Sequence, residues 1–122
     1  MFDSLKNLGA MASIMKDMPR IKARMEDVRR KAESTRVAAT SGGGAITVVA
    51  SGKLRIESIT IDPAVFAAGG GDPESRALAS ELLREAINGA LDRAQSTMTE
   101  MIGDAARDLN LPISTDELKG LI

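Results

Sequence analysis

Two long apolar stripes at helical spacing, one in each half of the chain, constrain its possible folds more than any other feature of the sequence. The first stripe alternates steps of three and four residues, which places its members on one side of a helix. It consists of Met11, Ile14, Met18, Ile21, Met25, Val28 and Ala32. The second stripe has similar spacing and consists of Leu83, Ile87, Leu91, Ala94, Met98, Met101 and Ala105. Each stripe needs an apolar partner, so the pattern predicts two long packed helices and favours an oligomer.

The first helix is expected over residues 1–34, with regular periodicity from Ile14 onward and an interruption at Pro19. A proline inside a helix removes one backbone hydrogen bond, and its ring presses on the preceding turn. We therefore expect either a bend near Met15 to Met18 or a new helix that starts with Pro19 in its first turn.

The segment between the stripes is rich in β-branched residues and is punctuated by glycines. Three short antiparallel strands are expected, at residues 35–40, 45–50 and 53–62. Gly42 to Gly44 fit the first hairpin loop, and Ser51 with Gly52 fits a two-residue turn. In the third strand the apolar side changes between Glu57 and Ser58, which predicts a bulge or a crossing between two packing surfaces.

The second long helix is expected over residues 72–110, after a short turn and glycine-rich loop at residues 63–71. Asp72, Pro73 and Glu74 supply a cap, a first-turn proline and a favourable charge for its start. Residues 111–122 are expected to form a tail in which Ser114 and Glu117 make a candidate capping box. The sequence thus predicts one α+β domain over residues 1–122: a long N-terminal helix, a three-stranded antiparallel sheet (35–62) and a long C-terminal helix.

Charge is divided unevenly between the first helix and the remainder. Residues 1–36 hold nine Lys or Arg against five Asp or Glu, whereas residues 37–122 hold seven against twelve. A cationic helix can neutralise phosphates, and this interaction is largely independent of base sequence. The candidate residues for binding duplex DNA are Lys16, Arg20, Lys22, Arg24, Arg29, Arg30 and Lys31.

The same cations have a second possible destination inside the protein. On a heptad wheel they flank the apolar seam on both sides, and a parallel self-coil would oppose Arg24 and Arg29, which repel each other. The seam is therefore expected to pack on another element. The second helix offers acidic partners, namely Glu81, Glu85, Asp92, Glu100, Asp104 and Asp108. The sequence alone leaves phosphate binding and internal pairing about equally supported.

Composition argues against several other classes of protein. The chain has no His and no Cys, and no polar cluster resembles a nucleophile or paired-carboxylate site, so we expect no enzyme, metal or cofactor. With only two aromatic residues, stacking on unpaired bases is disfavoured, so a nucleic-acid ligand is expected to be a duplex rather than a single strand. The glycine triplets lack the pattern of a nucleotide loop. No membrane span or signal pattern is expected, which favours a soluble, intracellular location.

Several short stretches resemble the YbaB/EbfC family of nucleoid-associated proteins. They are Met15 with Lys16, Val48 to Gly52, Ile59 to Pro63, the residues Ala86, Asn88 and Ala90, and Leu109 to Pro112. The resemblance spans roughly residues 5–112, and the order and spacing of these stretches carry it. Pro19, the Gly69 to Pro73 segment and the acidic body depart from the family pattern.

The resemblance implies a homodimer whose sheets associate and whose helices project like the arms of tweezers. It also implies binding of double-stranded DNA through basic helical residues with little sequence preference, in the cytoplasm and nucleoid, with a role in shaping the nucleoid or gene expression. No membrane or small-molecule partner is implied. The main alternative is a dimeric protein-interaction module with weak or no DNA binding.

Overall fold

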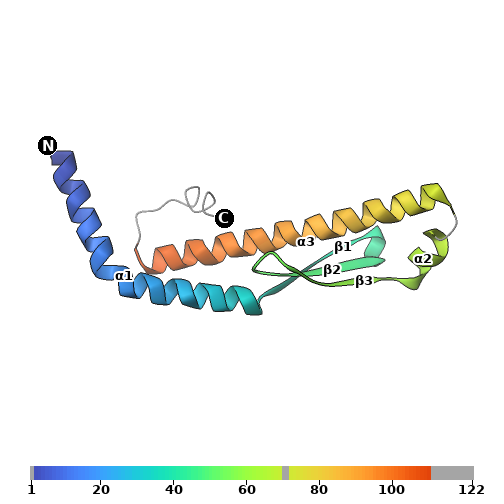
Figure 1. Ribbon diagram of the computed structural model, residues 1–122, viewed down its shortest axis with the longest axis horizontal. Coiled ribbons are helices and arrows are strands. Elements are labelled where there is room, and N and C mark those ends of the chain that lie inside the picture. Colours follow the sequence, from blue (N-terminus) through green and yellow to red (C-terminus); the bar gives the residue numbers. More distant parts are fainter. Residues whose placement is uncertain (1, 70–71, 111–122) are drawn as a thin grey trace.

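The computed structural model describes residues 2–69 and 72–110, and these form the predicted α+β arrangement. The elements are α1 (Phe2–Ser34), β1 (Arg36–Ser41), the 3-10 turn η1 (Gly42–Gly44), β2 (Ile46–Ser51), β3 (Ile56–Ile61), α2 (Pro63–Gly69) and α3 (Pro73–Asp108). α3 runs along the sheet and continues past it beside the second half of α1 (Figure 1). The candidate capping box at Ser114 and Glu117 lies outside the described residues.

The three strands form one antiparallel sheet in the order β1-β2-β3, so β1 and β3 are its edges. The predicted irregularity in the third strand is confirmed as a bulge. Val49 pairs with Ser58 and Ala50 pairs with Ile56, which leaves Glu57 as the extra residue. The bulge returns Ile56 to the face that carries Ile59, because one extra residue restores the parity of the side chains.

The connection between β2 and β3 differs from the predicted two-residue turn. It spans Gly52 to Arg55, and β3 begins at Ile56 rather than at residue 53. The Gly52 amide donates to the carbonyls of Ala32 and Thr35, at 3.1 Å each, so this turn is attached to the end of α1. Leu54 adopts a φ of 62° in the widened turn. These long-range bonds explain why local turn preferences gave the wrong length.

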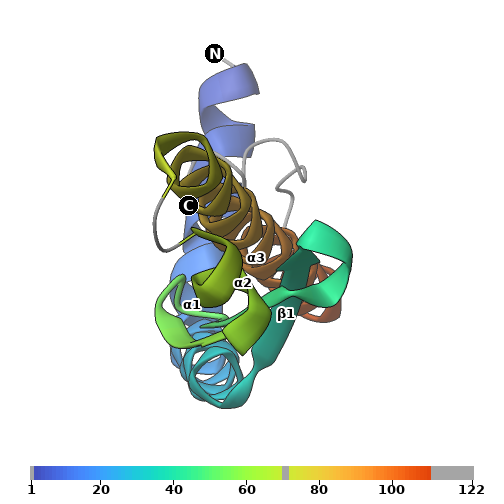
Figure 2. The same ribbon diagram turned by 90° about the vertical axis from the view of Figure 1, so that its right-hand side faces the viewer.

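Small side chains on α3 form the core against the sheet. Ala86, Ala90 and Ala94 are fully buried and pack in one cluster with Ile46 and Val48 of β2. Figure 2 shows α3 along one face of the sheet. Of the stripe predicted for this helix, Ala94 and Ala105 are buried but the larger residues are only half-buried. The helix turns its alanines to the sheet because they allow the two backbones to approach closely.

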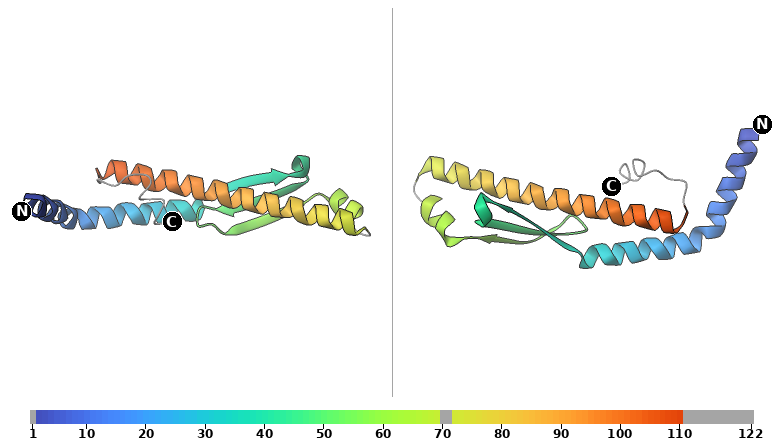
Figure 3. Two further views of the ribbon diagram at one scale, coloured as in Figure 1. Left: turned by 90° about the horizontal axis from the view of Figure 1, so that it is seen from above. Right: turned by 180° about the vertical axis from the view of Figure 1, so that it is seen from behind.

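α1 is one continuous helix that contains Pro19 and bends sharply (Figure 1). This matches the first of the two alternatives expected from the sequence, since a proline within a helix disrupts the preceding turn. Beyond the bend, the N-terminal part of α1 projects past the end of α3 in both views of Figure 3. Only the C-terminal part of the helix therefore packs on the body, through Val28 and Ala32.

Gly52 is expected to be essential for joining α1 to the sheet. A Cβ at this position would lie 2.8 Å from the carbonyl oxygen of Ala32 and 2.9 Å from its Cα, and neither backbone atom can move aside easily. Gly52→Ala should lower the free energy of unfolding by about 1–3 kcal/mol, as overpacking does elsewhere. Urea unfolding followed by circular dichroism measures the change.

Gly103→Ala is the matched control for the Gly52 substitution. A Cβ at Gly103 meets only Nη1 of Arg107, at 3.9 Å, and the residue lies within α3. Alanine should stabilise this helix by about 0.5–1 kcal/mol because glycine is a poor helix former. Equal stability of Gly52→Ala and the native protein would contradict the close approach at Ala32.

Candidate nucleic-acid interface

All seven predicted DNA-binding cations lie on α1, on both sides of the bend region and along the part that packs on the body. Six of them are exposed, and Arg24 is partly buried. Val28 and Ala32 turn toward the body, so the charged side chains occupy the remaining circumference of the helix. The structure therefore leaves most of the predicted cationic surface open to solvent.

Two arginines connect α1 to the C-terminal end of α3. Arg24 Nη2 lies 2.8 Å from Asp108 Oδ2, and Arg20 Nη2 donates to the Leu109 carbonyl at 3.3 Å. The end of a helix carries partial negative charge, which favours a cation at this point. Of the six acidic residues considered as internal partners, Asp108 is the one that pairs with a candidate cation among the described residues. Within the described part of the chain, the ion pairing of the candidate cations with α3 is thus limited to its C-terminal end.

Most arginines on α1 instead pair with a carboxylate three residues earlier on the same helix. Arg20 lies 3.6 Å from Asp17, Arg30 lies 2.6 Å from Asp27, and Arg29 pairs with Glu26. The hydrogen bond from Arg29 lowers the pKa of Glu26, so this carboxylate stays ionised. The spacing acid-x-x-Arg is visible in the sequence and is the signal that would have found these pairs.

The lysines on α1 differ from the arginines in their surroundings. Lys16, Lys22 and Lys31 are exposed, and none forms an ion pair with a residue that the structure describes. Lys31 borders a small groove between α1 and α3 together with Arg24, Asp27 and Met101. These three ammonium groups can therefore contact a phosphate without first breaking an ion pair to a described residue.

Three further cations lie close to the end of α1 and were missed in the sequence. Lys53 Nζ lies 2.6 Å from Glu33, Arg36 lies 3.5 Å from Glu57, and Arg55 is exposed. The bond to Lys53 lowers the pKa of Glu33. Arg36 follows α1 closely in the sequence. Lys53 and Arg55 lie in the β2–β3 turn, which is attached to the end of α1 by a long-range contact that no local pattern indicates.

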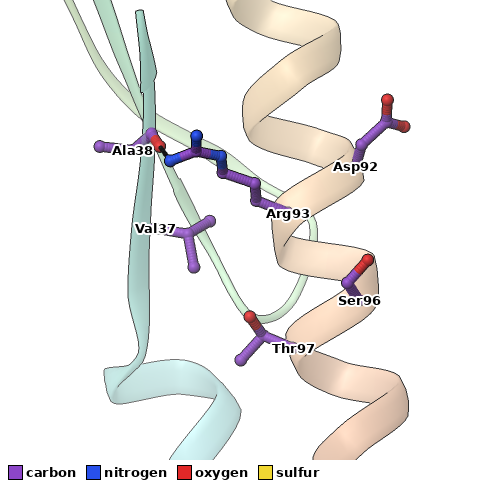
Figure 4. A pocket seen from close by; sticks show the side chains of 6 residues that line it. All are labelled: Val37, Ala38, Asp92, Arg93, Ser96 and Thr97. Carbon is purple, nitrogen blue, oxygen red and sulfur yellow. Dashed lines mark hydrogen bonds between the residues drawn. The ribbon is translucent and has the colours of Figure 1, made fainter.

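The hollow between β1 and α3 has a different character. It is lined by Val37, Ala38, Asp92, Arg93, Ser96 and Thr97 (Figure 4). Arg93 Nη1 donates to the Ala38 carbonyl at 2.7 Å, as the dashed line shows. β1 is an edge strand, and a charged side chain over an edge carbonyl hinders pairing with another strand. Arg93 is thus engaged with the sheet and does not add to the cationic surface of α1.

A second surface is apolar and exposed. On α1, Met11 and Met15 are 60% and 72% exposed, and the members of the predicted stripe that are described as buried, Val28 and Ala32, lie at its C-terminal end. On the sheet, Ile56 and Ile59 are 38% and 44% exposed because α3 covers β1 and β2 but leaves β3 largely uncovered. A single chain thus leaves part of the apolar stripe on α1 and the apolar side chains of the edge strand β3 exposed to solvent.

Among the described residues, no helix is both long enough and apolar enough to cross a membrane.

The solved structure of an uncharacterised protein, HP0035 from Helicobacter pylori, has a similar fold, with a TM-score of 0.56 and 18% sequence identity. The match covers 70% of this chain and 93% of that one.

Relatives in sequence give a more specific assignment. A nucleoid-associated protein of Clostridium kluyveri is 36% identical over 85% of this chain and 87% of its own length. One from Desulforamulus reducens is 34% identical over 85% of this chain and 94% of its own. The model of the YbaB/EbfC DNA-binding family matches residues 8–109. The chain therefore belongs to the YbaB/EbfC DNA-binding family.

Proposed function

We propose that this protein is a nucleoid-associated protein whose homodimer binds duplex DNA mainly through phosphates, in the cytoplasm and nucleoid. The observation that carries the proposal is the set of cations on α1, six of the seven exposed, in a chain that belongs to a DNA-binding family. The proposed contacts are Lys16, Arg20, Lys22, Arg24, Arg29, Arg30 and Lys31. Little sequence preference is expected, because contacts to phosphates carry no direct base information.

The surroundings of these cations rank their contributions. Lys16, Lys22 and Lys31 have no ion pair to break among the described residues and come first. Arg29 and Arg30 come second, since exposed ion pairs on a helix surface are weak and phosphate can replace a carboxylate. Arg20 and Arg24 come last, because their bonds to the end of α3 also hold the two helices together.

The homodimer part of the proposal draws on the uncovered apolar surface. An edge strand with exposed isoleucines is a template for association, and burial of such surface is favourable. A second copy that covers β3 and the α1 methionines would satisfy both. It would also present two cationic helices to one duplex and so increase the number of phosphates that are contacted.

Gel retardation of a random duplex over a range of salt concentrations tests the DNA-binding proposal. Four phosphate contacts would give a slope of log affinity against log salt of about −3.6, and an affinity loss of about 150-fold between 50 and 200 mM salt. If the protein fails to retard DNA at low salt, or if retardation does not change with salt concentration, binding through phosphates is excluded.

The exposed methionines on α1 support a second candidate function, a module that holds a protein partner, because flexible thioethers adapt to many surfaces. That function predicts weak DNA retention near physiological salt. It also predicts no change in retention when Arg20, Lys22 and Arg24 are replaced by Glu.

A further inference from the structure

We infer that Glu26 and Asp27 act as built-in competitors that hold Arg29 and Arg30 away from DNA and so limit the affinity of the proposed DNA-binding surface. Both carboxylates lie on the part of α1 that packs on the body, three residues before the arginine that each contacts. The inference presupposes the DNA-binding function proposed above and assigns a regulatory role to acidic residues within the same surface.

The contacts engage Arg29 through two donor groups and Arg30 through one. Arg29 Nε lies 3.1 and 3.2 Å from the two carboxylate oxygens of Glu26, and its Nη2 also donates to this carboxylate. Arg30 Nη2 lies 2.6 Å from Asp27 Oδ1. A guanidinium that grips a carboxylate with two donors uses the same fork that would grip a phosphate. A phosphate that binds the Nε–Nη2 fork of Arg29 must therefore displace Glu26, and one that binds Nη2 of Arg30 must displace Asp27.

Displacement also leaves the carboxylate beside the incoming phosphate. Glu26 and Asp27 lie on the same helix turn as the arginines, so they cannot move far from the DNA once the contact exchanges. Glu33 is a third carboxylate near Arg29, at 3.7 Å, and it also pairs with Lys53 at 2.6 Å. Each acid thus opposes DNA binding twice, by occupying the arginine before binding and by repelling phosphate afterwards.

Lys16, Lys22 and Lys31 form no ion pair with a residue that the structure describes, although Lys31 borders a groove that Asp27 and Asp104 also line. The surface therefore contains two kinds of cation. The lysine ammonium groups can contact phosphate directly, whereas the guanidinium groups of Arg29 and Arg30 are paired with carboxylates. This division keeps the affinity moderate and strongly salt-dependent, which suits a protein that contacts many sequences.

The test replaces the two competitors without changing side-chain size, in E26Q/D27N. Freeing two arginines should raise the affinity for a random duplex by up to about 60-fold at 0.1 M salt and make the salt slope more negative by up to about 1.8. Fluorescence anisotropy with a labelled duplex over a salt series measures both quantities.

E81Q/E85Q is the matched control, because it changes the net charge equally and frees an arginine of the same kind. Glu81 pairs with Arg84 three residues later, with side-chain exposures of 49% and 64%, close to the 49% and 57% of Glu26 and Arg29. This pair lies near the start of α3, at the end of the molecule far from α1 (Figure 1). A smaller gain than that of E26Q/D27N is expected. Equal gains would show an effect of net charge alone and would overturn the inference.

A mutant cycle gives a second readout. R29Q/R30Q should cost less affinity in the native background than in the E26Q/D27N background, where the cost reaches up to about 60-fold, because there the arginines bind phosphate without displacing a carboxylate. Equal costs in the two backgrounds would overturn the inference while leaving DNA binding intact. Absence of DNA binding by the native protein at low salt would instead remove the proposed function, and the inference with it.

Discussion

Replacement of Lys16, Lys22 and Lys31 by Gln is expected to weaken binding to a random duplex by about 500-fold at 0.1 M salt. Each lost phosphate contact removes about 0.9 from the salt slope, so the slope should become less negative by about 2.7. The fold should be unaffected, because none of the three forms an ion pair with a described residue and all are exposed. Fluorescence anisotropy across a salt series measures both effects.

Two double variants separate position from total charge. K16Q/K22Q removes two cations from α1, whereas R76Q/R84Q removes two from the first part of α3. The first should cost about 60-fold at 0.1 M salt if both contacts are lost, and the second far less. Similar losses for the two variants would show an effect of total charge rather than of position, and would contradict binding through α1.

Features that depend on nearby residues could be predicted from the sequence. The parity change between Glu57 and Ser58 lies within one strand, so it indicated the bulge directly. Asp72 accepts a hydrogen bond from the Glu74 amide as the start of α3 requires, because capping involves only adjacent residues. The cluster of cations on α1 likewise follows from helical spacing alone.

Features that depend on distant segments could not be predicted. The attachment of Gly52 to Ala32 set the length of the β2–β3 connection and brought Lys53 beside Glu33. The depth of burial on α3 depends on which residues fit against the sheet, and the small side chains of Ala86 and Ala90 fit better than the larger residues of the stripe. Periodicity gives the side of a helix that is apolar, but the partner decides which apolar residues are covered.

Ile59→Lys is expected to convert the proposed homodimer into a single chain. Ile59 is 44% exposed on the edge strand β3 and lies opposite the fully buried Val48, on the face of the sheet that α3 leaves uncovered at β3. A second copy would bury this side chain, and a lysine there would place a charge in the apolar contact. Sedimentation at micromolar concentration should give about twice 12.8 kDa for the native protein and about 12.8 kDa for the variant.

Thr60→Lys is the matched control, since Thr60 is exposed on the same strand and its side chain points to the opposite face. This variant should remain a dimer. A native mass of one chain would contradict the homodimer, and a dimeric Ile59→Lys protein would place the interface away from this face of β3.

Dimerisation and DNA binding are then linked through the number of cationic helices that reach one duplex. A single chain presents one α1, so the Ile59→Lys protein should show about half the native salt slope, because the slope counts neutralised phosphates. Thr60→Lys should keep the full slope. A monomeric variant with an undiminished slope would mean that one α1 makes all the contacts, and the second copy would then serve stability rather than DNA binding.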